Sequence, residues 1–358
     1  MSDDLAAPSD APAQELLRDI REQPDALRAL AGRASEYETV AREARLRKLT
    51  TVRLVAHGSS DNAASFAVYA FGIEARWTAF RDSISLHIYY GAEVDLGDSF
   101  VVALSQSGET PDVVEYVERA RARGAFTVAV TNEPESSLAE AAEAALPLVG
   151  VRERAIPATK TYTGQVAALA LLAAFAGGSG QAMVDGVHEA AGQLAASLPE
   201  LEERVSELAP SLAPVNRMFT IGRGPEYATA REIALKLLET CRVAAEALTA
   251  TDLVHGPVAA LDSSFPVWAI ASRDASLGAV QAAVARARSA GGAVIASGSA
   301  AVDLADATHR IPVPAASVPL LGPLLSVVPG QLLAWALARE KGLDPDRPAG
   351  ITKVTRTP

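Results

Sequence analysis

FVVALSQSGET, residues 100–110, joins an apolar run of strand length to a short polar turn rich in hydroxyl side chains. A continuous apolar run bounded by such a turn is typical of a strand that is buried on both faces of a parallel sheet. In open parallel sheets, ligands bind at the carboxyl ends of the strands. The stretch therefore predicts an α/β fold with a ligand site directly after this strand.

Strand-like runs alternate with helical segments on both sides of this stretch. The runs are VRLVAH (52–57), SLHIYY (85–90) and FTVAVT (126–131), and PDVVEYVERARARG (111–124) has helical spacing. Strands that alternate with helices are typical of parallel βαβ units whose sheet is covered by helices on both faces. We therefore expect a doubly wound α/β/α domain.

The same pattern occurs again about 165 residues later. MFTIGRG (218–224) corresponds to RLVAHGS, FPVWAIAS (265–272) to FVVALSQS, and ARARSAGGAVIAS (285–297) to ARARGAFTVAVT. A shared offset in order indicates an internal repeat, so we predict two tandem flavodoxin-like domains joined through the bend GGSG (177–180). The second copy carries SRDASL in place of SQSGET, and we expect the ligand site in the first copy only.

The predicted organisation has four parts. Residues 1–48 form a tail, disordered to about residue 12, followed by helices; 49–195 form the first domain, 205–340 the second, and 341–358 a C-terminal tail that contains Lys353.

Composition limits the classes of function. The chain has 358 residues, 49% of them hydrophobic, and its formal net charge of -11 argues against a nucleic-acid binder. Its apolar runs are too short for us to expect a membrane span. One cysteine, Cys241, allows no internal disulfide, so we expect a cytoplasmic protein. The histidines are dispersed without acidic or cysteine partners, so we expect no metal and no cofactor.

Polar turns in the first copy predict a phosphate site. They are GSSDN (58–62), SQSGET (105–110) and ATKTYT (158–163), each at the start of a predicted helix. Hydroxyls and backbone amides at helix N-termini bind phosphate, although each turn alone could be an ordinary N-cap. Because neither a P-loop nor a complete GxGxxG is present, a sugar phosphate is favoured over a nucleotide.

A second group of polar residues lies in the second copy. Glu232, Lys236 and Glu239 share one face of a predicted helix, and His255 precedes Gly-Pro in an apolar setting. The charged face could be a solvated stripe and the histidine a structural one. Near a sugar site, however, a carboxylate and a histidine could act as base and acid in enolisation.

Several motifs together resemble a known family. They are SQSGET, the ATK segment, ALKLLE, AEAL, the LVHGP turn and the lysine in GITKVT, in family order over about Arg53 to Lys353. On these motifs the chain resembles the sugar-isomerase (SIS) family, and in particular the isomerase half of glucosamine-6-phosphate synthase.

The resemblance implies a role for each matching residue. The phosphate would be held by Ser60, Ser105, Gln106, Ser107 and Thr110, with Thr159 close to the sugar. Glu239 would move a proton between C1 and C2, and Lys353 would form an imine with a ketose carbonyl. His255 would assist ring opening from the neighbouring subunit of a homodimer whose active site lies at the interface. Glu232 and Lys236 would shape and charge the pocket.

The chain also departs from the family pattern. No glutaminase domain with an N-terminal nucleophilic cysteine precedes the isomerase motifs, so we expect no glutamine hydrolysis. Ala158 stands where the family has a serine, and Ala349 where an arginine is common. These changes leave the identity of the sugar open.

The sequence therefore predicts an enzyme, a hydrolase or lyase acting on a phosphorylated amino sugar. The leading hypothesis is deamination of glucosamine 6-phosphate to fructose 6-phosphate and ammonia. The alternatives are a dehydratase acting on N-acetylglucosamine 6-phosphate, a fructosamine-6-phosphate deglycase, a deaminase for a galactosamine epimer, and a non-catalytic sugar-phosphate sensor.

Overall fold

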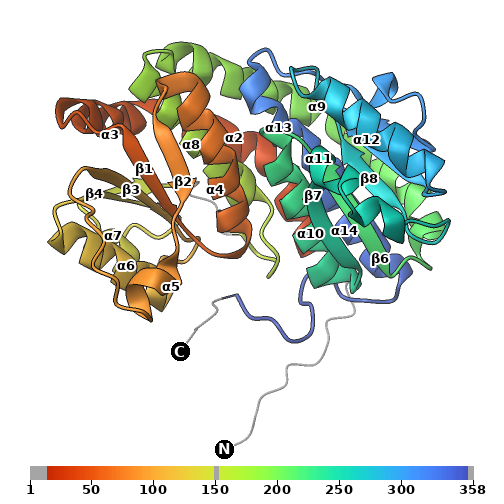
Figure 1. The fold of residues 1–358 in the computed structure, drawn as a ribbon, viewed down its shortest axis with the longest axis horizontal. Coiled ribbons are helices and arrows are strands. Elements are labelled where there is room, and N and C mark those ends of the chain that lie inside the picture. The colour runs from red at the N-terminus through yellow and green to blue at the C-terminus, as the bar shows by residue number, and fades with distance from the viewer. Residues whose placement is uncertain (1–13, 149–152, 354–358) are drawn as a thin grey trace, which may run out of the picture.

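Two parallel five-stranded sheets form the frame of the protein (Figure 1). The computed structural model describes residues 14–148 and 153–353, so the predicted disordered segment to residue 12 lies outside the described residues. The first sheet has the order β2-β1-β3-β4-β5 and the second has the order β10-β9-β8-β6-β7. When the strands of each sheet are renumbered from one in chain order, and the second sheet is read from β7 to β10, both orders are 2-1-3-4-5. This order confirms two tandem doubly wound domains of flavodoxin-like topology.

The strands have the following bounds. The first sheet contains β1 (Thr51–Val55), β2 (Thr78–Arg81), β3 (Ser99–Leu104), β4 (Phe126–Thr131) and β5 (Ala144–Pro147). The second sheet contains β6 (Arg217–Gly222), β7 (Ala244–Thr249), β8 (Val267–Ile270), β9 (Val294–Gly298) and β10 (His309–Pro312).

The helices have the following bounds. Around the first sheet lie α1 (Glu15–Arg21), α2 (Gln23–Ala31), α3 (Ala34–Leu46), α4 (Gly58–Ala70), the π-helical turn η1 (Phe71–Ala75), α5 (Ile84–Ile88), α6 (Pro111–Ala122), α7 (Ser137–Ala141) and α8 (Lys160–Gly177). The long α9 (Gly180–Leu212) leads to the second half, with α10 (Glu226–Cys241), α11 (Ala250–Val254), η2 (Pro257–Ala260), α12 (Leu277–Ser289), η3 (Ala301–Asp303), η4 (Pro319–Leu321), α13 (Gly322–Ser326) and α14 (Val328–Glu340).

β3 is buried along its whole length, as its apolar sequence predicts. Successive side chains of a strand point to opposite faces. Phe100 and Val102 accordingly join the core beneath α3, α4 and α8, whereas Val101 and Ala103 join the core beneath α6. A strand with apolar contacts on both faces must lie in the middle of a three-layer domain.

The prediction of a strand at residues 85–90 is wrong. That segment forms the short helix α5, which buries Ile84 and His87 on one side, and the strand beside β1 is instead β2. β2 is an edge strand that pairs with β1 from Thr51 opposite Thr78. The aromatic and β-branched residues of 85–90 favour a strand locally, but the place beside β1 is already taken, so tertiary context overrides propensity.

The predicted bend at residues 177–180 is confirmed. α8 ends at Gly177, Gly178 caps it with a φ of 93°, and α9 begins at Gly180. A side chain at Gly177 would meet the carbonyl oxygen of Glu74 at 1.9 Å, so this close approach requires glycine. α9 runs without a break across the predicted domain limits at 195 and 205, and those limits remain predictions.

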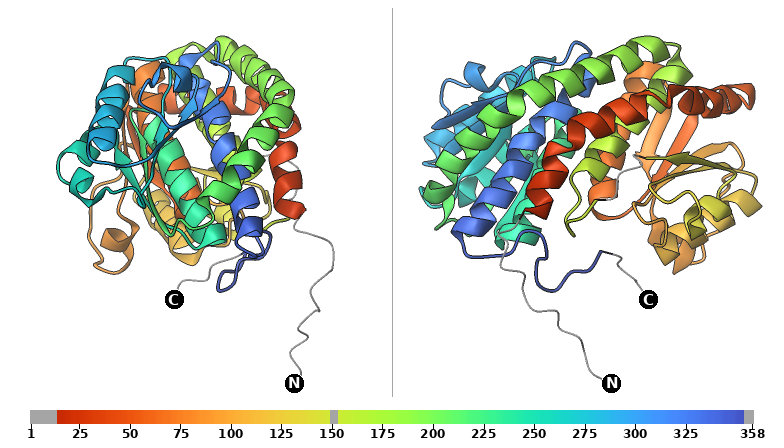
Figure 2. Two further views of the ribbon diagram at one scale, coloured as in Figure 1. Left: turned by 90° about the vertical axis from the view of Figure 1, so that its right-hand side faces the viewer. Right: turned by 180° about the vertical axis from the view of Figure 1, so that it is seen from behind.

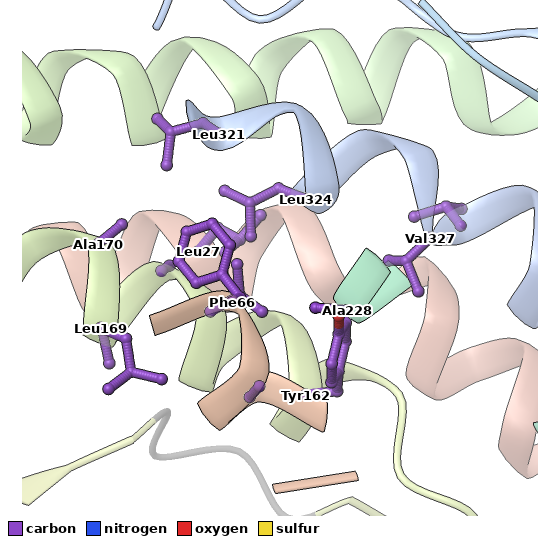
Figure 3. Close-up of a cluster of buried hydrophobic side chains, with 14 of the residues drawn as sticks. Leu27, Phe66, Tyr162, Leu169, Ala170, Ala228, Leu321, Leu324 and Val327 are labelled. Carbon is purple, nitrogen blue, oxygen red and sulfur yellow. The ribbon is translucent and has the colours of Figure 1, made fainter. Parts of the chain in front are cut away.

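The two halves share one hydrophobic core. Figure 3 shows Phe66 of α4, Tyr162 of α8 and Ala228 of α10 within it. α4 packs directly against α10, and α2, α9 and α14 lie side by side on the back of the molecule (Figure 2). This packing brings a helix of the second half against the ligand-binding end of the first.

One helical stretch of the described chain, Pro319–Glu340, is long and apolar enough to cross a membrane by length and composition. In the structure, 94% of its apolar 18-residue segment is buried inside the protein. Its apolar character is therefore that of a core segment, which packs against α9 and α10.

Candidate functional site

A pocket of about 270 Å³ lies at the carboxyl ends of β1 and β3. Two of its walls follow these strands directly, and the others come from the segment before α8, from α10 and from the C-terminal tail. The lining consists of His57, Gly58, Ser59, Ser60, Leu104, Ser105, Gln106, Ser107, Thr110, Ile156, Ala158, Thr161, Lys236, Glu239, Ile351, Thr352 and Lys353. Most of the predicted site residues therefore meet in one place.

Three serines of the pocket accept hydrogen bonds from neighbouring groups of the protein. Ser60 Oγ accepts from Gln165 Nε2 at 2.8 Å, Ser105 Oγ from the Gly108 N–H at 3.1 Å, and Ser107 Oγ from the Glu109 N–H at 3.2 Å. A hydroxyl whose oxygen already accepts keeps its proton for another partner. These serines can therefore donate to an anion, as the phosphate prediction requires.

The turn after β3 depends on Gly108. Its φ is +66°, and a Cβ at this position would lie 2.0 Å from Ser136 Oγ. The turn folds back so that Ser105 Oγ and Thr110 Oγ1 lie 3.2 Å apart, with α6 starting at the next residue. The polar turn of SQSGET therefore forms a concave wall at a helix N-terminus, which is a favourable place for an anion.

α10 places a chain of charged groups beside the pocket. Lys236 Nζ lies 2.5 Å from Glu239 Oε2 and 3.6 Å from Glu232 Oε1. Burial alone would lower the pKa of Lys236, but the two facing carboxylates raise it above its ordinary value. Lys236 is therefore a fixed ammonium that orients the Glu239 carboxylate at the pocket wall.

Glu232 lies behind this wall, with none of its surface exposed. Its carboxylate accepts from Ser59 Oγ at 2.9 Å and from Asn62 Nδ2 at 2.8 Å, so it ties α10 to the first turns of α4. Burial raises the pKa of Glu232 to about 7, against the opposing effect of Lys236. Glu232 positions its neighbours and does not line the pocket.

Lys353 reaches the pocket from the C-terminal tail, which crosses from the second half to the first (Figure 1). The tail is held by a hydrogen bond from the Ile156 N–H to the Asp346 carbonyl, at 2.9 Å, and Lys353 Nζ donates to the Ala155 carbonyl. Burial lowers the pKa of Lys353, with Glu153 partly opposing it. A lowered pKa increases the fraction of neutral amine, which is the form that attacks a carbonyl.

Thr159 lies behind the pocket wall and not on it. Its hydroxyl donates to Glu153 Oε1 at 2.8 Å, and its backbone N–H donates to the same oxygen. Glu153 also accepts from the Thr161 N–H at 3.3 Å, so it caps the N-terminus of α8. The neighbours Ala158 and Thr161 supply the wall instead.

His255 is not brought to the pocket of its own chain. It caps the C-terminus of α11, is exposed, and is absent from the lining. A role for His255 at this pocket would require a second subunit.

Some site residues were missed by reading the sequence. His57 and Ser59 line the pocket, and Glu153 orders one of its walls. His57 directly precedes the polar turn of residues 58–62, which is a signal that could have identified it. Glu153 has no comparable signal, because it acts through the backbone of α8.

The corresponding place in the second half is filled by the protein itself. Gly58 and Gly224 both have a positive φ, two residues before Ser60 and Glu226, respectively. Glu226 is 1% exposed, and its carboxylate accepts from Ser272 Oγ at 2.5 Å and from Ser326 Oγ at 2.6 Å. A buried carboxyl group thus occupies these hydroxyls in the second half, and a ligand site in the first copy only stays a prediction.

Neither a metal centre nor a reactive thiol is found in the described part of the chain. Within residues 14–148 and 153–353, no group of three or more His, Cys, Asp or Glu side chains could hold a metal ion. Cys241 is buried, and burial raises the pKa of its thiol to about 11. Cys241 is therefore a packed thiol and not a nucleophile.

A model of the SIS domain matches residues 45–175 and again residues 211–339. The chain belongs to the SIS domain family. The two matches coincide with the two sheets, and the family predicted from the motifs is confirmed.

Relatives of this SIS protein include sugar-phosphate enzymes. It is 35% identical over 367 residues to glutamine–fructose-6-phosphate aminotransferase [isomerizing] of Symbiobacterium thermophilum, a match that covers 95% of this chain and 58% of that relative. The C-terminal domain of glucosamine-fructose-6-phosphate aminotransferase from Francisella tularensis has a TM-score of 0.85 at 25% identity, covering 96% of this chain and 100% of that chain. Glucosamine-6-phosphate deaminase from Thermotoga maritima has a TM-score of 0.76 at 21% identity, covering 96% of this chain and 100% of that chain, and this likeness concerns the fold alone.

Proposed function

We propose that this SIS protein deaminates a phosphorylated amino sugar, and that its reaction converts glucosamine 6-phosphate and water to fructose 6-phosphate and ammonia. One observation carries the proposal: an anion cradle of serine hydroxyls, the Glu239 carboxylate and the Lys353 amine line a single pocket. The similarity to enzymes of amino-sugar and ketose phosphates supports the class of substrate.

In the first step, the serines and Thr110 hold the phosphate, and the Glu239 carboxylate acts on the open-chain sugar. Glu239 removes the proton from C2 and returns it to C1, while a second proton passes from nitrogen to the C1 oxygen. The product is the C2 imine of fructose 6-phosphate. Lys236 supports this step, because its ammonium holds the carboxylate 2.5 Å away in one orientation.

In the second step, the carbon–nitrogen bond at C2 is broken. The Lys353 amine adds to C2 and ammonia leaves, which forms an imine between Lys353 and the ketose. Water then adds to this imine and releases fructose 6-phosphate, and the lysine is regenerated. The lowered pKa of Lys353 supports its role as the attacking amine.

We further propose that the enzyme works as a homodimer in the cytoplasm. His255 is exposed and lies outside its own pocket, so it can serve ring opening only at the pocket of a partner subunit. The single cysteine is buried and reduced, which fits a reducing compartment.

The test is to incubate the protein with glucosamine 6-phosphate and measure ammonia and fructose 6-phosphate. Equimolar release of both is expected, and binding without release would reject the deaminase. A new ultraviolet chromophore from N-acetylglucosamine 6-phosphate would indicate a dehydratase. Release of an aldose phosphate and an amine from fructosamine 6-phosphate would indicate a deglycase, and binding of every sugar without any reaction would indicate a sensor.

A further inference from the structure

His57 stands at the phosphate end of the pocket, between the two strand-end turns. It is the N-cap residue of α4 in an extended conformation, directly before Gly58, and its side chain is 50% exposed. It lines the same pocket as Ser60 and Ser105. The imidazole therefore faces the same pocket space as the hydroxyls of those serines.

Asp112 fixes the ring of His57. Asp112 lies in the first turn of α6, its side chain is 10% exposed, and its Oδ2 is 2.8 Å from His57 Nε2. The pair therefore links the turn after β1 to the helix that follows the turn after β3. With Nε2 engaged, Nδ1 is the ring nitrogen left for a ligand.

This arrangement makes the pocket sensitive to protonation. In neutral His57 with its proton on Nε2, Nδ1 is an acceptor and repels a phosphate oxygen. In protonated His57, both nitrogens are donors, and Nδ1 can form a charge-assisted hydrogen bond. Asp112 orients the ring, because its carboxylate accepts a hydrogen bond from Nε2.

The other charged groups near the pocket are already committed. Lys236 is paired with Glu239 and Glu232. Lys353 Nζ donates to the Ala155 carbonyl, and burial lowers the pKa of Lys353 and so favours its neutral amine. On the neighbouring turns, Glu109 binds Ser137 and Asp61 pairs with Arg81 and Arg231. Within the described chain the pocket lining contains no arginine, and the protein as a whole carries a net charge of -11. A phosphate therefore finds hydroxyl donors at this end of the pocket, but little uncommitted positive charge apart from His57.

We infer that His57 is a phosphate-recognition residue: when protonated and held by Asp112, it supplies the positive charge that the serine cradle lacks. The inference rests on the proposed phosphate site but not on the deamination chemistry. A phosphate is then expected to bind more tightly when the His57 ring is protonated than when it is neutral.

The experiment measures binding of sulfate by calorimetry at about pH 6 and about pH 8.5, a range that spans histidine titration. Sulfate is a dianion at both values, so any pH dependence comes from the protein. The wild type is expected to lose affinity by about tenfold between these pH values, which is the size of one charge-assisted hydrogen bond. His57→Gln is expected to bind weakly at both, and His57→Arg tightly at both.

Asp112→Asn keeps an oxygen that can accept from Nε2 but removes the carboxylate charge. Its affinity for sulfate at about pH 6 is therefore expected to lie between those of the wild type and His57→Gln. His188→Gln, on the exposed side of α9, is the matched control and should behave as the wild type does. Thermal melts of each variant establish that it is folded.

A wild type with flat affinity, or a His57→Gln variant that keeps the pH dependence, would overturn the inference. Absence of sulfate binding in the wild type would reject the phosphate cradle and the role of His57 with it. Sulfate binding with the expected pH dependence, but without ammonia release from glucosamine 6-phosphate, would support the role of His57 in anion binding and reject the proposed deaminase activity.

Discussion

Lys236 and Glu239 form an ion pair on one face of α10, with 2.5 Å between Nζ and Oε2. The lysine side chain is 2% exposed and the glutamate side chain 22% exposed, so the pair points from the protein interior into the pocket. One carboxylate oxygen is held by the ammonium, which leaves the other to reach a substrate proton.

Glu239→Gln is expected to reduce kcat by about 10²- to 10⁴-fold, the usual contribution of a positioned base. The amide keeps the shape of the side chain but cannot accept the C2 proton. Binding of the sugar phosphate, measured by calorimetry, should change little, because the serine cradle is untouched. Glu203→Gln, on the exposed face of α9, serves as the control. Weak binding with normal turnover would reverse this assignment.

Glu232→Gln is expected to increase the free energy of unfolding, and more at pH 7 than at pH 5. Because burial raises the folded-state pKa of Glu232 to about 7, the folded protein holds a proton that the unfolded chain has lost above its ordinary pKa. The contribution of Glu232 to the stability of the wild type therefore falls between about pH 4.5 and about pH 7, by at most about 1.4 kcal/mol per unit of pKa shift. Urea unfolding at both pH values measures the difference, and an equal effect at both would contradict the raised pKa.

Lys353 is expected to be trapped as an alkylated lysine when the protein is treated with fructose 6-phosphate and borohydride. Reduction converts an imine to a stable secondary amine, which peptide mass spectrometry locates. Lys353→Arg should abolish the adduct, whereas Lys48→Arg, at an exposed site in the first half, should not. An adduct at another lysine in the wild type would exclude Lys353 as the imine-forming residue.

Mixing two inactive variants tests whether the active site is shared between subunits. His255→Gln and Glu239→Gln, unfolded and refolded together, are expected to regain about a quarter of wild-type activity, because half of the dimers are mixed and each has one intact site. Each variant refolded alone should stay inactive. If both residues act in one chain, the mixture will gain nothing.

Glu153→Gln separates a positioning role from a purely structural one. Loss of the charge weakens the cap of α8, and we expect about 1 kcal/mol less free energy of unfolding in urea. It also removes a carboxylate that opposes the lowering of the Lys353 pKa, so the pH profile of imine trapping should move to lower pH. A change in stability without a shift in the pH profile would show that Glu153 acts through the α8 cap alone.

Prediction from sequence succeeded where the structure of a segment is determined by residues close to it along the chain. The apolar runs of β3 and β4 predicted strands, and both strands are buried from end to end. The glycines at 177–180 predicted the bend, and at Gly177 a side chain would clash with the backbone of Glu74. The prediction failed at residues 85–90, because β2 occupies the position beside β1. The residues of 85–90 carry no local signal that another segment pairs with β1.

The sequence by itself determined the two-domain α/β frame, the SIS family and the hydroxyl-rich turn after β3. These features depend on apolar periodicity, on the internal repeat and on local turn residues, all of which can be recognised in the sequence alone. Only the tertiary structure decided that α10 and the tail from the second half complete a pocket of the first, that Glu153 orders its wall, and that Asp112 fixes His57. The contacts of Glu153 and Asp112 require the first half to fold, because they join segments that are separated along the chain. The walls supplied by α10 and the tail exist only once the two halves have packed against each other through the shared core.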